Sequence, residues 1–148
     1  MAVISILATL AALPLLRARL TANESVVVGN LRGLANGLAM YRVANSRYPA
    51  QWQADMYDRA DPDYAPARFN ADLNGAVTIQ GYVYHYEVPA DPAVTYTISA
   101  RPVALHLTGA RTFWVNEREE MFHCAGDSAS VSVPDAVPGI AEAPVACP

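Results

Sequence analysis

The three histidines are the first candidates for metal binding or proton transfer. They are His85, His106 and His123. Metal sites built from His and Cys place their ligands at short, characteristic spacings. None of the three stands at such a spacing from another histidine or from Cys124. We therefore predict no metal site at the histidines, and we expect His85 and His123 to lie in strands.

One segment carries half of the pattern of a calcium-binding loop. Asn70–Gly75 has oxygen-bearing side chains at alternate positions and a glycine at the sixth, as in the first half of an EF-hand loop. The acid required at the twelfth position is missing, because Gly81 stands there. The preferred interpretation is a plain Asn74-Gly75 turn, with calcium binding as the alternative, and no cofactor is predicted.

No other set of residues indicates catalysis or nucleic-acid binding. Ser, His and Asp, or Cys and His, do not occur in a recognisable catalytic context, and there is no phosphate-binding glycine loop. The acidic run Glu117–Glu120 is interpreted as a solvated turn. The net charge of −4 argues against a basic surface for nucleic acid. We predict that the protein is not an enzyme.

The first 44 residues are predicted to form one long helix, and its first part is apolar. Met1–Leu16 contains only Ser5 and Thr9 as polar residues, with Pro14 near its end. This run is shorter than the roughly 20 residues that span a bilayer. Three interpretations compete: a secretory signal peptide, a buried helix of a soluble protein, and a membrane helix shortened at its N-terminus. Arginines follow the run rather than precede it, which is not typical of a signal peptide.

From Arg17 onward the helix is amphipathic, with two stripes of residues at helical spacing. Apolar residues recur every three or four positions, and we name this set the leucine stripe: Val27, Leu31, Leu34, Leu38 and Tyr41. A second set recurs every four positions and is named the glycine stripe: Gly29, Gly33 and Gly37. Glycine costs about 1 kcal/mol relative to alanine in a helix. Such a stripe therefore indicates close approach of another backbone.

The rest of the chain, 47–148, is predicted to be a globular head. Prolines and turn residues mark 47–81 as a loop, with a short helix at Gln51–Arg59 that buries Trp52 and Met56. From Gly81 the apolar period changes to two. Four consecutive strands are expected at 82–88, 95–102, 111–116 and 121–124, followed by a coil at 125–148 in which Val131, Val133 and Val137 form a last edge strand. The leucine stripe is expected to cover this antiparallel meander.

Two segments resemble the type IV pilins and the pseudopilins of type II secretion. The helix shares with them Pro14, Leu16, Arg17, Ala18, Arg19 and the run Ala22-Asn-Glu-Ser25. The sheet is similar to that of a pilin subgroup in Thr97-Ile-Ser-Ala-Arg-Pro102 and in Gly109-Ala-Arg-Thr-Phe-Trp-Val-Asn-Glu117. The chain lacks the family's basic leader, its glycine cleavage site and the Phe-Thr-Leu-x-Glu segment. We therefore expect a start codon assigned too late, a truncated coding sequence or a degenerate paralogue.

The resemblance implies an α+β fold, in which a long N-terminal helix packs on a four-stranded antiparallel meander. Residues 1–20 would lie in the membrane or the filament core, 21–46 would form the amphipathic half, and 47–148 would form the head, divided into 47–81, 82–124 and 125–148. The leucine stripe would pack on the sheet, and the glycine stripe on neighbouring helices of the filament. A disulfide between Cys124 and Cys147 would staple the C-terminal segment, although two unpaired thiols are the alternative if the chain is not exported.

The function that the resemblance implies is that of a structural subunit of a type IV pilus-like filament. Its partners would be copies of itself or other pilins, inner-membrane lipid before assembly, and the assembly machinery. It would lie first in the bacterial inner membrane and then in an extracellular pilus or a periplasmic pseudopilus. The alternatives are a type II secretion pseudopilin and a secreted or periplasmic ligand-binding domain behind a signal sequence.

Overall fold

The computed structural model describes residues 2–89, 94–126 and 145–146, with side chains described for 15–89 and 94–126. One helix, α1 (Ala2–Asn45), runs without interruption through Pro14. It ends where Ser46 adopts a left-handed conformation, with φ 59°, and donates its N–H to Arg42 O at 2.7 Å. This geometry closes a helix C-terminus. The predicted end of the helix near Asn45-Ser46 is therefore confirmed.

The four predicted strands are present and form an antiparallel meander. They are β2 (Tyr82–Glu87), β3 (Thr97–Pro102), β4 (Arg111–Asn116) and β5 (Met121–Ala125). The structure adds β1 (Val77–Ile79), which pairs antiparallel with β2, and β6 (Val145–Ala146), which pairs parallel with β5. The expected edge strand at Val131, Val133 and Val137 lies outside the described residues. The α+β fold is thus confirmed, with a larger sheet than predicted.

The β1–β2 hairpin was missed because its first strand is only three residues long. Its turn is Gln80-Gly81, and both residues have positive φ, 51° and 80°. A two-residue turn with two positive φ angles matches the natural twist of a hairpin, and it favours glycine. The signal was therefore present at Gly81, but Val77–Ile79 is too short to show an alternating pattern.

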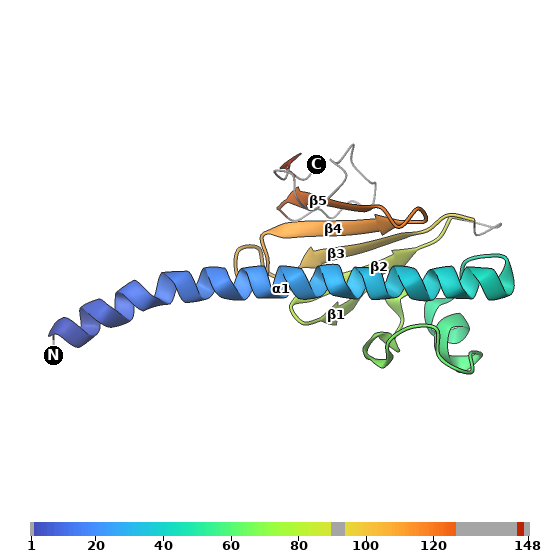
Figure 1. Cartoon of the computed structure of the whole chain (residues 1–148), viewed down its shortest axis with the longest axis horizontal. Coiled ribbons are helices and arrows are strands. Elements are labelled where there is room, and N and C mark those ends of the chain that lie inside the picture. The colour runs from blue at the N-terminus through green and yellow to red at the C-terminus, as the bar shows by residue number, and fades with distance from the viewer. Residues whose placement is uncertain (1, 90–93, 127–144, 147–148) are drawn as a thin grey trace.

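Helix α1 lies along one face of the sheet, and its N-terminal part extends beyond the sheet (Figure 1). The helix contacts β4 and β3. The sheet offers it tyrosines at alternate positions of β2, namely Tyr82, Tyr84 and Tyr86, which are all buried. Alternate positions of a strand point to one face, so the three rings line the helix-facing side. They join the core cluster that also contains Ile98 and Phe113.

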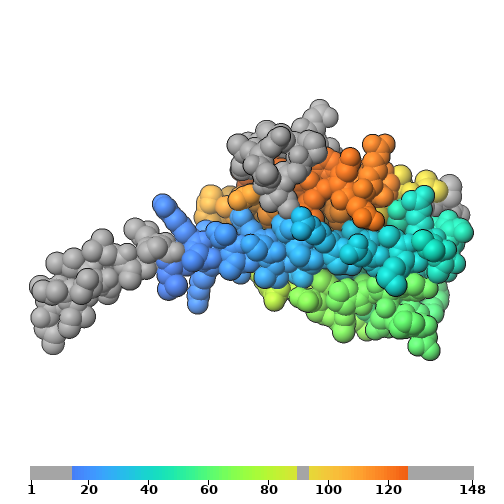
Figure 2. All heavy atoms as spheres, viewed as in Figure 1, coloured from blue at the N-terminus to red at the C-terminus, as the bar shows by residue number. Residues whose placement is uncertain are grey.

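The loop between α1 and the sheet fills the space along one side of the helix, as the space-filling view shows (Figure 2). It contains the π-helical turn η1 (Ala54–Asp58) and two 3-10 turns, η2 (Ala67–Phe69) and η3 (Leu73–Gly75). Trp52 and Met56 are fully buried, as predicted for a short helix in this region. Trp52 contacts the Tyr86 ring at 5.1 Å between centroids, and Phe69 contacts the Tyr84 ring at the same distance. The loop therefore completes the core.

Candidate assembly surface on helix α1

The side of α1 that carries the leucine stripe packs on the protein's own sheet. Leu31, Leu34 and Leu38 have no exposed surface, and Val27 and Tyr41 are 1% and 5% exposed. All five belong to the same buried cluster as the β2 tyrosines. Full burial of one leucine side chain contributes roughly 1.5–3 kcal/mol. This side of the helix is therefore the main source of attachment between helix and sheet.

Polar residues attach the helix to the β3–β4 connection. Asn23 donates from Nδ2 to Thr108 O at 2.9 Å. Glu24 accepts the Ala110 N–H at Oε1, 2.9 Å, and its Oε2 lies 3.2 Å from Arg111 Nε. Glu24 is largely buried, so its charge requires these partners. The helix segment 22–25 and the sheet segment 109–117 thus meet here, since Asn23 and Glu24 belong to one and Gly109–Arg111 to the other.

The same attachment requires a glycine at position 109. A Cβ atom at Gly109 would overlap the phenol ring of Tyr82, which is fully buried. The Tyr82 hydroxyl donates to Arg111 O at 3.2 Å. The ring is therefore held in place by its hydrogen bond and by the core. The connection can pass over the ring only if residue 109 has no side chain.

The glycine stripe does not face a single environment, which corrects the prediction made for it. At Gly37 an added Cβ would lie 2.3 Å from Tyr64 O, so the close backbone belongs to the chain's own loop. Gly33 has only Pro66 Cγ nearby, at 4.0 Å, and Gly29 has nothing within 4 Å. Gly37 is thus occupied within the subunit and is not available to a neighbouring helix, whereas Gly29 is open.

The outward side of α1 carries mostly small and apolar residues. On a helical wheel at 100° per residue, this side is centred on Gly29, opposite Leu38. Met40 and Val43 on it are 61% and 86% exposed, and Arg32 is its one charged member. A face of small residues lets a second helix approach closely. We name it the outer face, and its members are all exposed: Leu15, Ala18, Ala22, Ser25, Val26, Gly29, Arg32, Asn36, Met40 and Val43.

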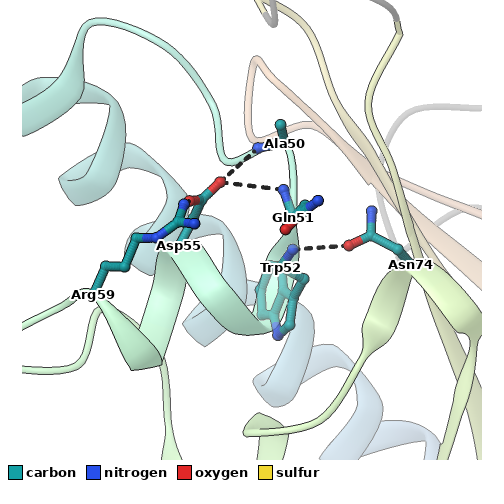
Figure 3. A network of polar contacts seen from close by, with 6 residues as sticks. All are labelled: Ala50, Gln51, Trp52, Asp55, Arg59 and Asn74. Atoms are coloured by element: carbon teal, nitrogen blue, oxygen red, sulfur yellow. Dashed lines mark hydrogen bonds and ion pairs between the residues drawn. The ribbon is translucent and has the colours of Figure 1, made fainter.

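The loop beside α1 is held by a buried carboxylate. Asp55 Oδ2 accepts the N–H groups of Ala50 and Gln51 at 3.0 and 3.1 Å, and Oδ1 pairs with Arg59 Nη1 at 2.9 Å (Figure 3). Asp55 is 6% exposed. Charged acceptors of this kind are stronger than neutral ones. These bonds fix the start of the η1 turn. Because both carboxylate oxygens are bonded by groups of the same loop, the role of Asp55 is structural.

The predicted turn at Asn74-Gly75 is a 3-10 turn whose side chains bond to the chain itself. Asp72 Oδ1 accepts the Asn74 N–H at 3.1 Å. Asn74 Oδ1 accepts the Trp52 N–H at 2.8 Å, and Figure 3 shows this second bond. An open cavity of about 490 Å³ lies between this turn and η1, lined in part by Gln53 and Asp58. Within the described residues, no three His, Cys, Asp or Glu side chains are grouped to hold a metal ion.

The three histidines lie on different elements. His85 is on β2, and its Nε2 atom lies 3.2 Å from Asn74 O. His106 is exposed in the β3–β4 connection. His123 is buried on β5 beside the Phe113 ring. His85 and His123 are therefore strand residues, as predicted. Cys124 is buried on β5, opposite Val145 of β6. Cys147 lies outside the described residues, so its pairing with Cys124 stays a prediction.

Burial raises the pKa of six tyrosines above the ordinary value. For each of them removal from water is the main cause, since it disfavours the phenolate. The hydrogen bond from Asn30 Nδ2 to the Tyr84 hydroxyl, 3.0 Å, opposes the rise in pKa at Tyr84. These tyrosines remain neutral core residues at physiological pH. The six are Tyr41, Tyr57, Tyr82, Tyr84, Tyr86 and Tyr96.

Sequence reasoning missed the polar residues that hold the pieces together. Nothing in the sequence placed Glu24 beside Arg111, because the two residues lie in segments far apart along the chain. Asn30, whose Oδ1 also accepts Arg68 Nη1 at 3.1 Å, was a polar residue beside a buried stripe, and that position was a usable signal. Asp55 had no signal beyond Arg59 four residues later, which is a helical ion-pair spacing.

Comparisons with known proteins provide no relative from which a function could be inferred. No family model, no curated protein and no solved structure matches the chain. Within the part of the chain that the structure describes, no helix has both the length and the apolar character needed to cross a membrane.

Proposed function

We propose that the protein is a structural subunit of a type IV pilus-like filament, either a pilin or a pseudopilin, and that it has no catalytic role. One observation carries this proposal. A single helix packs one side on its own sheet, leaves a face of mostly small and apolar residues exposed on the other side, and continues well beyond the head (Figure 1). These are the features that a helix-cored filament needs from each subunit.

The projecting part of α1 requires a partner. Among the described side chains of the helix, Asn23 is the first that bonds to the head, so the helix before it extends by about 30 Å at 1.5 Å per residue. An isolated helix is marginally stable in water, and the sequence of Met1–Leu16 is almost wholly apolar. Lipid before assembly, and the helices of sister subunits afterwards, would provide that environment.

The outer face supports helix–helix contact beside the sheet. Its small members Ala18, Ala22, Ser25 and Gly29 recur every three or four residues and are exposed. Helices with small residues at such spacing approach to short distances. The leucine stripe meanwhile keeps the sheet on the opposite side. In this proposal the sheet forms the filament exterior, and a Cys124–Cys147 disulfide staples the C-terminal segment to β5.

The test is to locate the native chain and its assembled form. Shearing of native cells, followed by immunogold electron microscopy with antibodies to this chain, is expected to label thin filaments. A Gly29→Leu variant, which adds bulk where nothing lies within 4 Å, is expected to fold but not to enter the filaments. Normal incorporation of that variant would contradict the role given to the outer face.

A second candidate is a secreted or periplasmic ligand-binding domain. The lining of the cavity of about 490 Å³ beside η1 includes the polar side chains of Gln53, Asp58 and Asp72, and this observation favours the ligand-binding domain. Mass spectrometry of the mature N-terminus separates the two functions. Cleavage after the apolar run, with a soluble monomer as the product, would support the ligand-binding domain, whereas retention of the apolar helix would support the filament subunit.

A further inference from the structure

The connection between β3 and β4 displays apolar side chains to solvent. Val103, Leu105 and Leu107 are 53%, 39% and 68% exposed. They belong to one short segment, 103–107, in which the neighbouring residues are Ala104 and His106. Apolar residues grouped in this way on a surface indicate a contact with another molecule or with a membrane.

Most backbone N–H groups of this connection are hydrogen-bonded within the head. Val103 N donates to Gly81 O, His106 N to Gly109 O, and Leu107 N and Thr108 N to Ala104 O, at 2.8–3.1 Å. The Thr108 hydroxyl lies 3.1 Å from both the N and the O of Ala104. Each N–H group that is already bonded can enter an apolar medium without the several kcal/mol that an unpaired group costs. The connection is therefore an apolar projection in which most of the backbone N–H groups are already bonded within the head, namely those of Val103, Ala104, His106, Leu107 and Thr108.

This projection lies at the end of the head from which α1 extends (Figure 1). Its Thr108 carbonyl accepts the Asn23 side chain of the helix. About two turns before Asn23, Leu15 and Leu16 are 63% and 46% exposed. The exposed leucines of the helix and those of the connection thus belong to the same end of the molecule, which we name the projecting end.

Among the described residues of segments 15–25, 79–81 and 103–110, the exposed charged side chains are of one sign. Arg17 and Arg19 are exposed. The segments that form this end, 15–25, 79–81 and 103–110, contain a single acid, Glu24, which is buried against Arg111. The exposed acids of the loop and of the β4–β5 turn, such as Asp61 and Glu119, lie in other segments. Apolar side chains with neighbouring arginines are the combination that binds an anionic lipid surface.

We infer that the projecting end is a membrane-surface contact. Val103, Leu105 and Leu107 enter the interfacial layer of the bilayer, while Arg17 and Arg19 bind phosphate groups of anionic phospholipids. The inference rests on the proposed function, because it places the head on the same bilayer that holds the N-terminal part of α1. It adds a defined orientation, in which the β3–β4 connection faces the lipid and the β4–β5 turn faces away.

A tryptophan probe tests this orientation. The full chain with Leu107→Trp is mixed with vesicles of phosphatidylcholine and phosphatidylglycerol, with and without brominated lipid. We expect a blue-shifted emission that brominated lipid quenches. The matched control is Val43→Trp, on α1 near its other end and 86% exposed, and we expect it to be quenched by aqueous acrylamide only. Trp52 and Trp114 are buried and contribute the same background to both.

Vesicle flotation measures the strength of the contact. Leu107→Ser is expected to weaken binding about tenfold, the change that corresponds to roughly 1.4 kcal/mol for part of one leucine's burial. Arg17→Gln and Arg19→Gln are expected to weaken it about fivefold each, and only when anionic lipid is present. Val43→Ser is expected to leave binding unchanged.

Three results would overturn the inference. If the chain floats with vesicles but the tryptophan introduced at position 107 is as accessible to acrylamide as the one introduced at position 43, the orientation is wrong and the filament function stands. If the chain does not float at all, both the orientation and membrane anchoring fail. If the probe at position 107 shifts to the blue without lipid as the chain self-associates, the patch binds a second copy of the chain instead.

Discussion

The two sides of helix α1 differ in what they contact and in the residues that they use. The sheet-facing side buries leucines completely and adds Glu24 and Asn30 as polar attachments. The outer face, one half-turn away, exposes alanine, glycine, serine and apolar side chains, with Arg32 as its one charge. A helix of a monomeric protein normally places charged and polar residues on its solvent side. The composition of the outer face therefore supports the proposal that one side of the helix serves folding and the other serves association.

The largest expected effect is on the sheet-facing side. Leu34→Ala removes buried methyl groups and leaves a cavity, so we expect the free energy of unfolding to fall by about 2–5 kcal/mol. Denaturant unfolding of the full chain in mild detergent, followed by the fluorescence of Trp52 and Trp114, measures it. The matched control is Met40→Ala, a truncation of similar size on the outer face. A similar loss for that variant would mean that the outer face is also packed within the subunit.

The two ends of the glycine stripe give opposite predictions. Gly37→Ala places a methyl group 2.3 Å from Tyr64 O, so the loop must move, and we expect a loss of about 1–3 kcal/mol as for other overpacked sites. Gly29→Ala meets nothing within 4 Å and gains helix propensity, so we expect a gain of about 1 kcal/mol. Both values come from the same unfolding measurement. Equal changes at the two positions would contradict the conclusion that Gly37 is packed against the loop whereas Gly29 is open.

The buried tyrosines predict a loss of stability in alkali. Their pKa values are raised by burial, so the unfolded chain ionises first, near pH 10. Stability is therefore complete below pH 10 and falls above it, by up to about 1.4 kcal/mol per pH unit for each tyrosine. Absorbance of tyrosinate during a pH titration is expected to rise together with unfolding. Ionisation of all tyrosines near pH 10, while the fold persists, would contradict their burial beneath the helix.

The polar attachment has a smaller expected effect. Glu24→Gln keeps one acceptor for the Ala110 N–H but loses the charge that pairs with Arg111, so we expect a loss of about 1 kcal/mol. The control is Glu87→Gln on the exposed end of β2, expected within about 0.5 kcal/mol of the parent. If both variants unfold alike in the same denaturant series, the attachment contributes nothing measurable.

The sequence predicted the elements of this fold better than their connections. Periodicity located α1 and strands β2–β5, because burial of one face imposes periods of 3.6 and two. It did not show that the loop backbone at Tyr64 approaches Gly37, since a glycine in a helix has the same signal whether its neighbour is in the same chain or in another. The Glu24–Arg111 pair joins residues far apart in sequence, and no local pattern reports such a pair.

The outer face of α1 is proposed to contact a sister molecule, and site-specific cross-linking tests this contact most directly. The photoreactive residue p-benzoylphenylalanine replaces Met40, which is 61% exposed, and in a control it replaces Glu87, in chains assembled into filaments. We predict cross-linked dimers joined through α1 of the neighbour for position 40 and none through α1 for position 87. Absence of the dimer at position 40, or equal α1 cross-links at both positions, would contradict the claim.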